Sequence, residues 1–388
     1  MVTYPKNWKV KKISALATIK TGSRDTQDNK PNGRYPFFVR SQTVEHIDLY
    51  DFDCEAVLTA GDGVGTGKVF HYIDGKFAAH QRVYVMSNFS DVLGKYFYYY
   101  FSKNFISEVE KYTAKSSVDS VRRARIADME FPFPADALEQ EYIVKVLESF
   151  DAYIDDLAEL IEKKKNIRDG ALEDLVTGKT RLDGYAGDWT SVSFNQVIIP
   201  KARIGWQGLK KHEYLRSGYS YLIGGTDFLN GSINFDGISY VTKERYDMDP
   251  NIQVSENDVL VTKDGTIGKV AIVPKLKKPA TLNSGVFVFR TNKRLSPRYL
   301  YRILSSSVFG EFIDTLSAGS TIKHLYQKDL KKFEFDIPID IDEQESIAEI
   351  LSSMDKEIIN LEEERDKMIQ IRDGAMDDLL SGRVRLEN

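Results

Sequence analysis

One segment of 46 residues occurs twice in this chain of 388 residues, at positions 139–184 and 343–388. The copies align at a constant offset of 204 without a gap, and 21 of the 46 positions are identical. The most similar stretch reads IRDGALEDLVTGKTRL from Ile167 to Leu182 and IRDGAMDDLLSGRVRL from Ile371 to Leu386. Identity of this extent indicates an internal duplication, so the fold must contain two equivalent segments.

Both copies carry the signals of a long helix. Each follows a proline, Pro134 or Pro338, and begins with Glu-Gln-Glu, which places acidic side chains where the helix dipole is positive. The apolar residues then alternate between spacings of four and three, which is typical of a coiled-coil seam. They occupy positions 143, 147, 150, 154, 157 and 161, and in the second copy 347, 351, 354, 358 and 361, before Arg365 interrupts the pattern. Gly178 and Gly382 follow the last apolar turn, where a left-handed C-terminal cap is expected.

The length of these helices restricts how they can pack. A helix of roughly 38 residues is on the order of 55 Å long, and its apolar stripe stays exposed unless something equally long covers it. The other copy is the only comparable segment of the chain, so we predict that the two helices pair within one polypeptide. A coiled coil between two chains is the alternative.

The blocks outside the repeated segments resemble each other more faintly. YPKNW at position 4 is matched by YAGDW at 185, and DGVGTGKV at 62 by DGTIGKV at 264. HQRVYVM at 80 is matched by NSGVFVF at 283, and TAKSSV at 113 by SAGSTI at 317. Short alternating runs such as RVYV and GVFV predict β-strands, whereas KYFYYYFSKNFISEV and RYLYRILSSSVFGEFI predict amphipathic helices. Each block is therefore predicted to form a compact α+β domain.

The predicted order is an α+β domain at 1–135, a helical region at 136–184, a second α+β domain at 185–342 and a second helical region at 343–388. The formal charges of these four parts are +4, −6, +4 and −7, which together give the net charge of −5. A polyanion binds to basic surfaces. If the chain binds one, we expect the two domains, and not the helices, to make the contact.

Several function classes are disfavoured. The single cysteine, Cys54, cannot form an internal disulfide, and the five histidines show no ligand spacing, so we expect no metal site. No stretch approaches the roughly 18 to 20 apolar residues of a membrane span, and no signal-peptide core is present at the N-terminus, so we expect a cytoplasmic protein. GDGVGTGKV is not a P-loop, because Asp62 replaces its first glycine and Val69 its serine or threonine. No adenine-methyltransferase tetrapeptide or duplicated nuclease-like cluster occurs either, so we expect no catalytic residues.

Two α+β domains, each followed by a nearly identical helix with EQ near its start and IRDGA before its end, resemble the specificity subunit of type I restriction-modification systems. The resemblance covers essentially the whole chain. In that family each globular domain is a target recognition domain that reads one half of a split DNA site. The two helices pair antiparallel, set the spacer between the half-sites and dock two methyltransferase subunits, which restriction subunits join. The resemblance implies a non-catalytic chain without cofactors, with S-adenosylmethionine and ATP bound by the partner subunits only.

Sequence-specific DNA recognition requires basic groups for phosphates and polar groups for base edges. In the first domain the candidates are Arg24, Arg34, Arg40, Lys68, His80, Gln81, Arg82, Lys115, Ser116, Arg122 and Arg123. In the second domain they are Lys201, Arg203, Lys210, Lys211, Thr226, Asp227, Lys263, Lys269, Asn283, Ser284, Lys323 and His324. Lys68 is matched with Lys269, and His80-Gln81-Arg82 with Asn283-Ser284-Gly285; different chemistry at equivalent positions would suit the reading of different bases. A solvated surface charge is the alternative for each residue.

The repeated signature supplies the candidates for partner docking. These are Ile167, Arg168, Asp169 and Leu175, and their counterparts Ile371, Arg372, Asp373 and Leu379. A coiled-coil scaffold whose two globular domains bind proteins is the alternative function. Co-purification of a methyltransferase would favour the specificity subunit over that scaffold.

Overall fold

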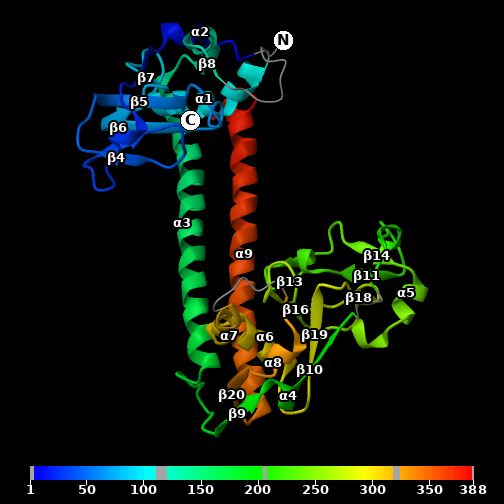
Figure 1. The fold of residues 1–388 in the computed structure, drawn as a ribbon. Coiled ribbons are helices and arrows are strands. Elements are labelled where there is room, and N and C mark those ends of the chain that lie inside the picture. Colours follow the sequence, from blue (N-terminus) through cyan, green and yellow to red (C-terminus); the bar gives the residue numbers. More distant parts are fainter. Residues whose placement is uncertain (1–3, 111–119, 204–207, 318–323, 387–388) are drawn as a thin grey trace. The chain divides into compact units, whose positions relative to one another are not determined.

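The computed structural model describes residues 4–110, 120–203, 208–317 and 324–386. The chain divides into two compact units, Met1–Glu159 with Glu362–Asn388 (unit 1) and Leu160–Leu361 (unit 2). Helix α3 (Ala137–Val176) and helix α9 (Ile341–Leu379) are continuous, as Figure 1 shows, and each contributes one end to each unit. The two predicted long helices are therefore confirmed, and their 40 and 39 residues match the expected length.

Helices α3 and α9 end just before Gly178 and Gly382, as the sequence predicted. Gly178 has a φ of 70° and Gly382 a φ of 73°, the left-handed backbone conformation that only glycine adopts without strain. At Gly382, a β-carbon would lie only 2.6 Å from the ring of Pro5. A side chain at this position would therefore both strain the cap and push the N-terminal segment away.

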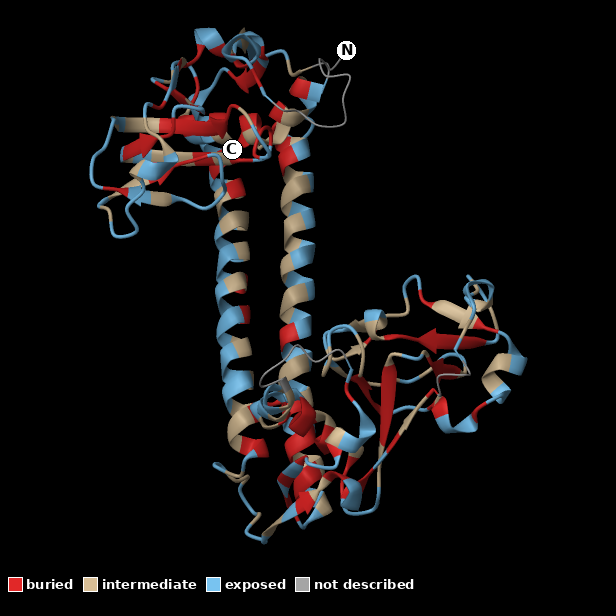
Figure 2. Ribbon diagram, in the orientation of Figure 1, coloured by how far each residue is buried: buried red, intermediate tan, exposed pale blue. Residues whose placement is uncertain are grey.

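The helices pair antiparallel within each unit. In unit 1, Arg372 contacts Asp151 while Arg385, further along α9, contacts Glu139, which lies earlier on α3. In unit 2, Arg168 contacts Asp355 and Arg181 contacts Glu343, again in opposite chain directions. The prediction of pairing within one polypeptide is thus confirmed. The seam is buried at positions 143, 147, 157, 161, 347, 351 and 358 and half-buried at 150, 154, 354 and 361. Figure 2 shows that most of the buried helical residues lie near the helix ends.

Unit 1 contains a six-stranded sheet in the order β2-β7-β5-β6-β3-β4. The strands are β2 (Thr18–Thr21), β3 (Tyr35–Phe38), β4 (Glu45–Ile47), β5 (Phe52–Ala60), β6 (Phe70–Ala79) and β7 (Val83–Ser87). All neighbours are antiparallel except β3 and β6. Helix α1 (Gly94–Glu110) packs against β5 and β6 through the aromatic side chains of YFYYYF, which are mostly buried.

Unit 2 repeats this strand connectivity in two four-stranded sheets, ordered β10-β19-β16-β17 and β14-β11-β18-β15. The strands are β10 (Ile198–Ala202), β11 (Ser220–Ile223), β14 (Ser239–Val241), β15 (Gln253–Val254), β16 (Val259–Thr262), β17 (Val270–Ile272), β18 (Ala280–Leu282) and β19 (Val286–Thr291). The hairpin β12 (Phe228–Leu229) and β13 (Ser232–Ile233) is an addition. As β3 does with β6, β11 runs parallel to β18, so the fainter sequence repeat corresponds to a repeated topology.

A two-stranded sheet joins each domain to the start of its long helix. Strands β1 (Trp8–Lys12) and β8 (Glu130–Pro134) pair in unit 1, and β9 (Trp189–Ser193) and β20 (Glu334–Pro338) in unit 2. The buried side chain of Gln140 donates to the carbonyls of Pro134 and Asp91 and accepts from the Leu93 amide. Gln344 makes the same three bonds with Pro338, Arg294 and Ser296. The repeated Glu-Gln-Glu therefore fixes each helix to its own domain.

Candidate nucleic-acid interface and partner surface

Loops from five parts of unit 1 meet at one edge of its sheet. The Gly61 amide donates to Arg82 O at 2.8 Å, and the Val121 amide donates to Gly61 O at 2.8 Å. The His80 amide donates to Phe38 O at 2.9 Å and the Gln81 amide to Arg24 O at 2.9 Å. These bonds gather the carboxyl ends of β2, β3, β5 and β6 and the amino end of β7 into one loop cluster, which we call edge 1.

Unit 2 forms the same cluster with the same backbone pattern. The Lys263 amide donates to Gly285 O at 2.9 Å, and the Leu325 amide donates to Lys263 O at 2.9 Å. The Asn283 amide donates to Ile223 O at 2.8 Å, just as His80 does to Phe38. By these backbone bonds, His80 is equivalent to Asn283 and Arg82 to Gly285, as the sequence alignment proposed. We call this second cluster edge 2.

Edge 1 is organised by the carboxylate of Asp62. Arg40 donates from Nη1 to Asp62 Oδ1 at 2.9 Å, and Arg82 donates from Nη1 to the other oxygen, Oδ2. Partial burial raises the pKa of Asp62, but the hydrogen bonds from Arg82 and Arg40 outweigh it and bring the pKa below the usual aspartate value. Asp62 was not among the sequence candidates, although its repetition as Asp264 in the matched DG turns was a usable signal.

Two more candidates at edge 1 have acidic partners. Arg24 gives both Nε and Nη2 to Asp51, at 2.9 Å and 2.5 Å. The side-chain amide of Gln81 donates from Nε2 to Asp25 Oδ2 at 3.1 Å. These partners restrain the side chains of Arg24 and Gln81 and occupy part of their hydrogen-bond donors.

At edge 2 the carboxylate of Asp264 lies 2.6 Å from Nδ1 of His324. The backbones of Asp264 and His324 also form an isolated β-bridge, and those of Asp62 and Ser120 form the matching bridge in unit 1. Asn283 accepts the Tyr214 hydroxyl at 3.3 Å. The ammonium of Lys263 lies 5.5 Å from the centre of the Phe287 ring. Edge 2 therefore presents an amide and an imidazole, whereas edge 1 presents guanidinium groups at other positions of the shared frame.

Two sequence candidates point into the protein, which corrects the expectation that they lie on the surface. Arg203 is 2% exposed and donates to Leu282 O at 2.9 Å, and burial lowers the pKa of its guanidinium. His80 is 3% exposed, and its Nδ1 accepts the Arg82 amide at 3.0 Å. The hydrogen bonds that Arg203 and His80 make inside the protein offset part of the free-energy cost of burying their polar side chains.

The remaining candidates are distributed around the two edges and their flanks. Lys68 and Lys269 are exposed, and each follows a glycine of positive φ, Gly67 or Gly268. Lys201 and Asp227 are half-buried, and Asp227 accepts the Gly224 amide. The other exposed candidates are Arg34, Arg122, Arg123, Lys210, Lys211, Thr226 and Ser284. Lys115, Ser116 and Lys323 lie outside the residues that the structure describes.

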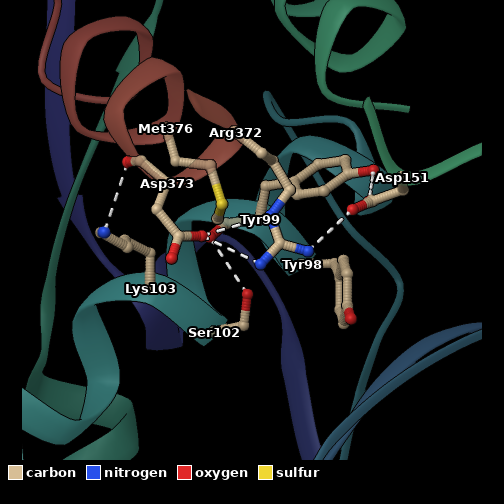
Figure 3. Close-up of a pocket in the computed structure, with 8 residues that line it drawn as sticks. All are labelled: Tyr98, Tyr99, Ser102, Lys103, Asp151, Arg372, Asp373 and Met376. Carbon is tan, nitrogen blue, oxygen red and sulfur yellow. Dashed lines mark hydrogen bonds and ion pairs between the residues drawn. The ribbon is translucent and has the colours of Figure 1, made fainter. Parts of the chain in front are cut away.

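The repeated helical signature builds a polar network in each unit. In unit 1, Asp151 accepts from Arg372 at 3.1 Å and from the Tyr99 hydroxyl at 2.7 Å, as Figure 3 shows. Arg372 also donates to Asp373, and Lys103 contacts Asp377 at 3.1 Å. Burial and the bond to Asp151 both raise the pKa of Tyr99, so its hydroxyl stays protonated as a donor.

Unit 2 has the same network with one change. Asp355, the counterpart of Asp151, accepts from Arg168 at 2.5 Å and from Arg302 at 2.6 Å, so an arginine takes the place of Tyr99. In unit 1 the network borders a polar pocket of about 290 Å³ that Tyr98, Ser102, Lys103 and Met376 also line. The network residues Asp151, Asp355, Tyr99 and Arg302 were not predicted, although both aspartates are identical positions of the repeat.

The docking candidates separate into exposed and buried residues. Ile167 and Ile371 are 50% and 44% exposed, whereas Arg168 and Arg372 are held by the networks and also contact Asp169 and Asp373. Leu175 and Leu379 are buried in the apolar cores of units 2 and 1. Their assignment to a docking surface is therefore corrected, because packing within the chain already covers them.

Residues 5–167 and 207–370 match the family model of the type I restriction modification DNA specificity domain. The chain belongs to this family. It is 22% identical over 415 residues to the type I restriction enzyme MjaVIII specificity subunit of Methanocaldococcus jannaschii, a match that spans 99% of this chain and 94% of that subunit. It is 26% identical over 200 residues to the type I restriction enzyme EcoDI specificity subunit of Escherichia coli. That second match spans 50% of this chain and 43% of the Escherichia coli protein.

The fold of the type I specificity family is also found in solved structures. The crystal structure of a type I restriction-modification system S subunit from M. genitalium aligns with a TM-score of 0.64 and 18% identity, over 96% of each chain. The prediction of a specificity subunit, the non-catalytic component of such a system, is confirmed by the family match and the named relatives. Within the described part of the chain, no helix has the length and apolarity that crossing a membrane requires.

Proposed function

We propose that the chain recognises a bipartite double-stranded DNA site, with edge 1 reading one half and edge 2 the other. The supporting observation is that one loop frame, defined by equivalent backbone bonds, carries different polar side chains in the two units. A shared frame with different side chains suits two readings of DNA, because base edges are distinguished by the donors and acceptors placed opposite them. The two domains are also net positive, at +4 each, whereas the two helical regions are net negative.

The helices serve two purposes in this proposal. Their networks at Asp151 and Asp355 form matched surfaces on which two copies of one methyltransferase subunit dock, and restriction subunits join that core. Two equivalent surfaces on one chain are what two identical partners require. The uninterrupted length of α3 and α9 sets the number of unread base pairs between the half-sites.

The chemistry belongs to the partners. S-adenosylmethionine binds to the methyltransferase subunits and ATP to the restriction subunits, and this chain binds neither. Methylation of a base within duplex DNA requires that the base be turned out of the helix, and the pocket that accepts it lies in the methyltransferase. Because the substrate is chromosomal DNA, the complex works in the cytoplasm.

The experiment that tests this function is the assembly of the chain with its methyltransferase subunits, followed by mapping of the methylated sites on a genomic library. We expect methylation at one motif composed of two specified parts around an unspecified spacer. Insertion of one heptad into both helices, after residues 158 and 362, should lengthen the spacer and leave both specified parts unchanged. A continuous motif, or a spacer that does not respond, would contradict the proposal.

A further inference from the structure

Three arginines of edge 1, Arg24, Arg40 and Arg82, differ in how many of their donors are engaged. Arg24 gives its Nε and Nη2 to Asp51, so the side of its guanidinium that can make a double hydrogen bond is occupied. Arg40 and Arg82 each give only Nη1, to the two oxygens of Asp62. Among the described residues neither makes another side-chain hydrogen bond or ion pair, so Nε and Nη2 of both arginines are available.

The available groups face solvent while their anchor does not. The side chains of Arg40 and Arg82 are 41% and 60% exposed, but that of Asp62 is 17% exposed. A half-buried carboxylate thus fixes Nη1 of each guanidinium and leaves Nε and Nη2 accessible to solvent. Fixing a side chain before binding reduces the conformational entropy that binding would otherwise remove.

This arrangement suits a base better than a phosphate. An arginine that presents two donors in one plane matches O6 and N7 of guanine, which is the most common specific contact in the major groove. The shared carboxylate also neutralises one of the two positive charges, which weakens the attraction to a phosphate that two free arginines would exert. The two arginines therefore keep the planar donor geometry that suits guanine, while the net charge of the group that they form with Asp62 is reduced.

Edge 2 lacks this arrangement at the equivalent positions. The backbone correspondence of Phe38 with Ile223, and of Gly61 with Lys263, pairs Arg40 with Gly225 and Arg82 with Gly285. Asp264 nonetheless keeps the place of Asp62, and a β-carbon added at Gly285 would lie 3.8 Å from Asp264 Oδ2, an ordinary contact distance. Gly285 does not have a positive φ, so a side chain there is not strained. Edge 2 therefore retains the anchor but not the arginines.

We propose that Arg40 and Arg82, held by Asp62, read guanine in the half-site of unit 1, and that Asp62 is the positioning residue for both. This inference rests on the proposed function, because it identifies the base that one of the two edges recognises. Unit 2 reads its half-site without an arginine at these positions.

The test uses the complex of the chain with its methyltransferase subunits and synthetic duplexes of its bipartite site. The half-site of unit 1 is first identified by exchanging residues 1–135 for those of another specificity subunit. Guanines in that half are then replaced one at a time by 7-deazaguanine, which lacks the N7 acceptor. We expect at least one replacement to weaken binding roughly 5- to 150-fold.

Three variants separate base reading from charge. In R82A, the 7-deazaguanine replacement that removes the contact of Arg82 should weaken binding no further, because the arginine that contacts this N7 is already absent. R82K keeps the charge but cannot make the planar double bond, so it should behave like R82A in the 7-deazaguanine test. D62N leaves one oxygen to accept from one arginine, and it should reduce discrimination between guanine and adenine while the half-site of unit 2 is read as before.

A gain of function provides the complementary test. G285R places an arginine beside Asp264 and should add a guanine preference to the half-site of unit 2. If no 7-deazaguanine replacement matters in unit 1, and R82A weakens all duplexes equally with a smaller salt slope, the arginines contact phosphates and the inference is overturned. A bipartite site without guanine in the half of unit 1 also overturns it but leaves the proposed function standing, whereas the absence of any bipartite site removes the proposed function itself.

Discussion

Arg385 donates Nε and Nη2 to the carboxylate of Glu139, at 2.6 Å and 2.7 Å, across 246 positions of the chain. Glu139 lies at the start of α3 and is buried, and Trp8 donates to the same carboxylate at 3.3 Å. Arg181 and Glu343 form the matched pair in unit 2, at 2.6 Å and 2.8 Å. Each pair closes the end of one long helix onto the start of the other within its unit.

The first prediction concerns this closure. Arg385→Ala leaves a buried carboxylate without its cation, so we expect the free energy of unfolding of unit 1 to fall by about 2 to 3 kcal/mol. Chemical denaturation followed by tryptophan fluorescence would measure it. The double variant R385A/E139Q removes the uncompensated charge and should recover part of the loss. Equal stability of R385A and the unchanged chain would contradict the role assigned to the pair.

The second prediction concerns Gln140 and Gln344. Each of these buried side chains makes three hydrogen bonds, and replacement by alanine leaves two carbonyls and an amide without their partner, at a cost of about 3 kcal/mol. The amide of Leu93 should exchange its hydrogen faster in Q140A, and that of Ser296 in Q344A. Hydrogen exchange read by NMR distinguishes these local effects, and the unaltered half of the chain serves as the control for each variant.

The third prediction is a pH dependence in unit 1. Burial lowers the pKa of His71 below its usual value, although a bond from the ring to Ser41 O at 3.0 Å partly opposes the shift. His71 therefore binds a proton more readily in the unfolded chain than in the folded chain. Its contribution to the free energy of unfolding should be fully present above about pH 6.5 and should decline as the pH falls below that value. His71→Gln should flatten this part of the profile. Parallel pH profiles of the variant and the unchanged chain would show that His71 has no such role.

The fourth prediction concerns partner docking and rests on the proposed function. Ile167 and Ile371 are exposed beside the two networks, so a charge at either position should weaken one of two equivalent docking surfaces. I167D and I371D should each reduce the complex from two methyltransferase subunits to one, and the double variant should bind neither. Native mass spectrometry gives the stoichiometry. Two bound subunits in the double variant would place docking elsewhere.

Much of the fold was predictable because it depends on local periodicity and on the repeat. The seam spacing predicted α3 and α9, and Gly178 and Gly382 predicted their ends, since these signals act within a few residues. The equivalence of His80 with Asn283 also followed from sequence, because turns and strands of similar length preserve register. The duplicated Glu-Gln-Glu pointed to a shared role, but its partners at Leu93 and Ser296 emerged only from tertiary structure.

The candidate site was harder to predict for a physical reason. Composition cannot tell an arginine with free donors from one that an acid or the interior already engages. Arg24, Arg40 and Arg203 look alike in sequence, yet one is bound by Asp51, one is oriented by Asp62 and one is buried. Leu175 and Leu379 were likewise assigned to a partner surface because the repeat is strong there, whereas the structure uses them for internal packing.

The central claim, that each edge reads its own half of one DNA site, is tested most directly by single-molecule mapping of methylated bases after one domain is exchanged. Residues 1–135 would be replaced by the matching block of another specificity subunit, with both helices and residues 185–342 kept. We predict that one specified part of the motif changes while the other part and the spacer length stay the same. A change in both parts, or in neither, would contradict the claim.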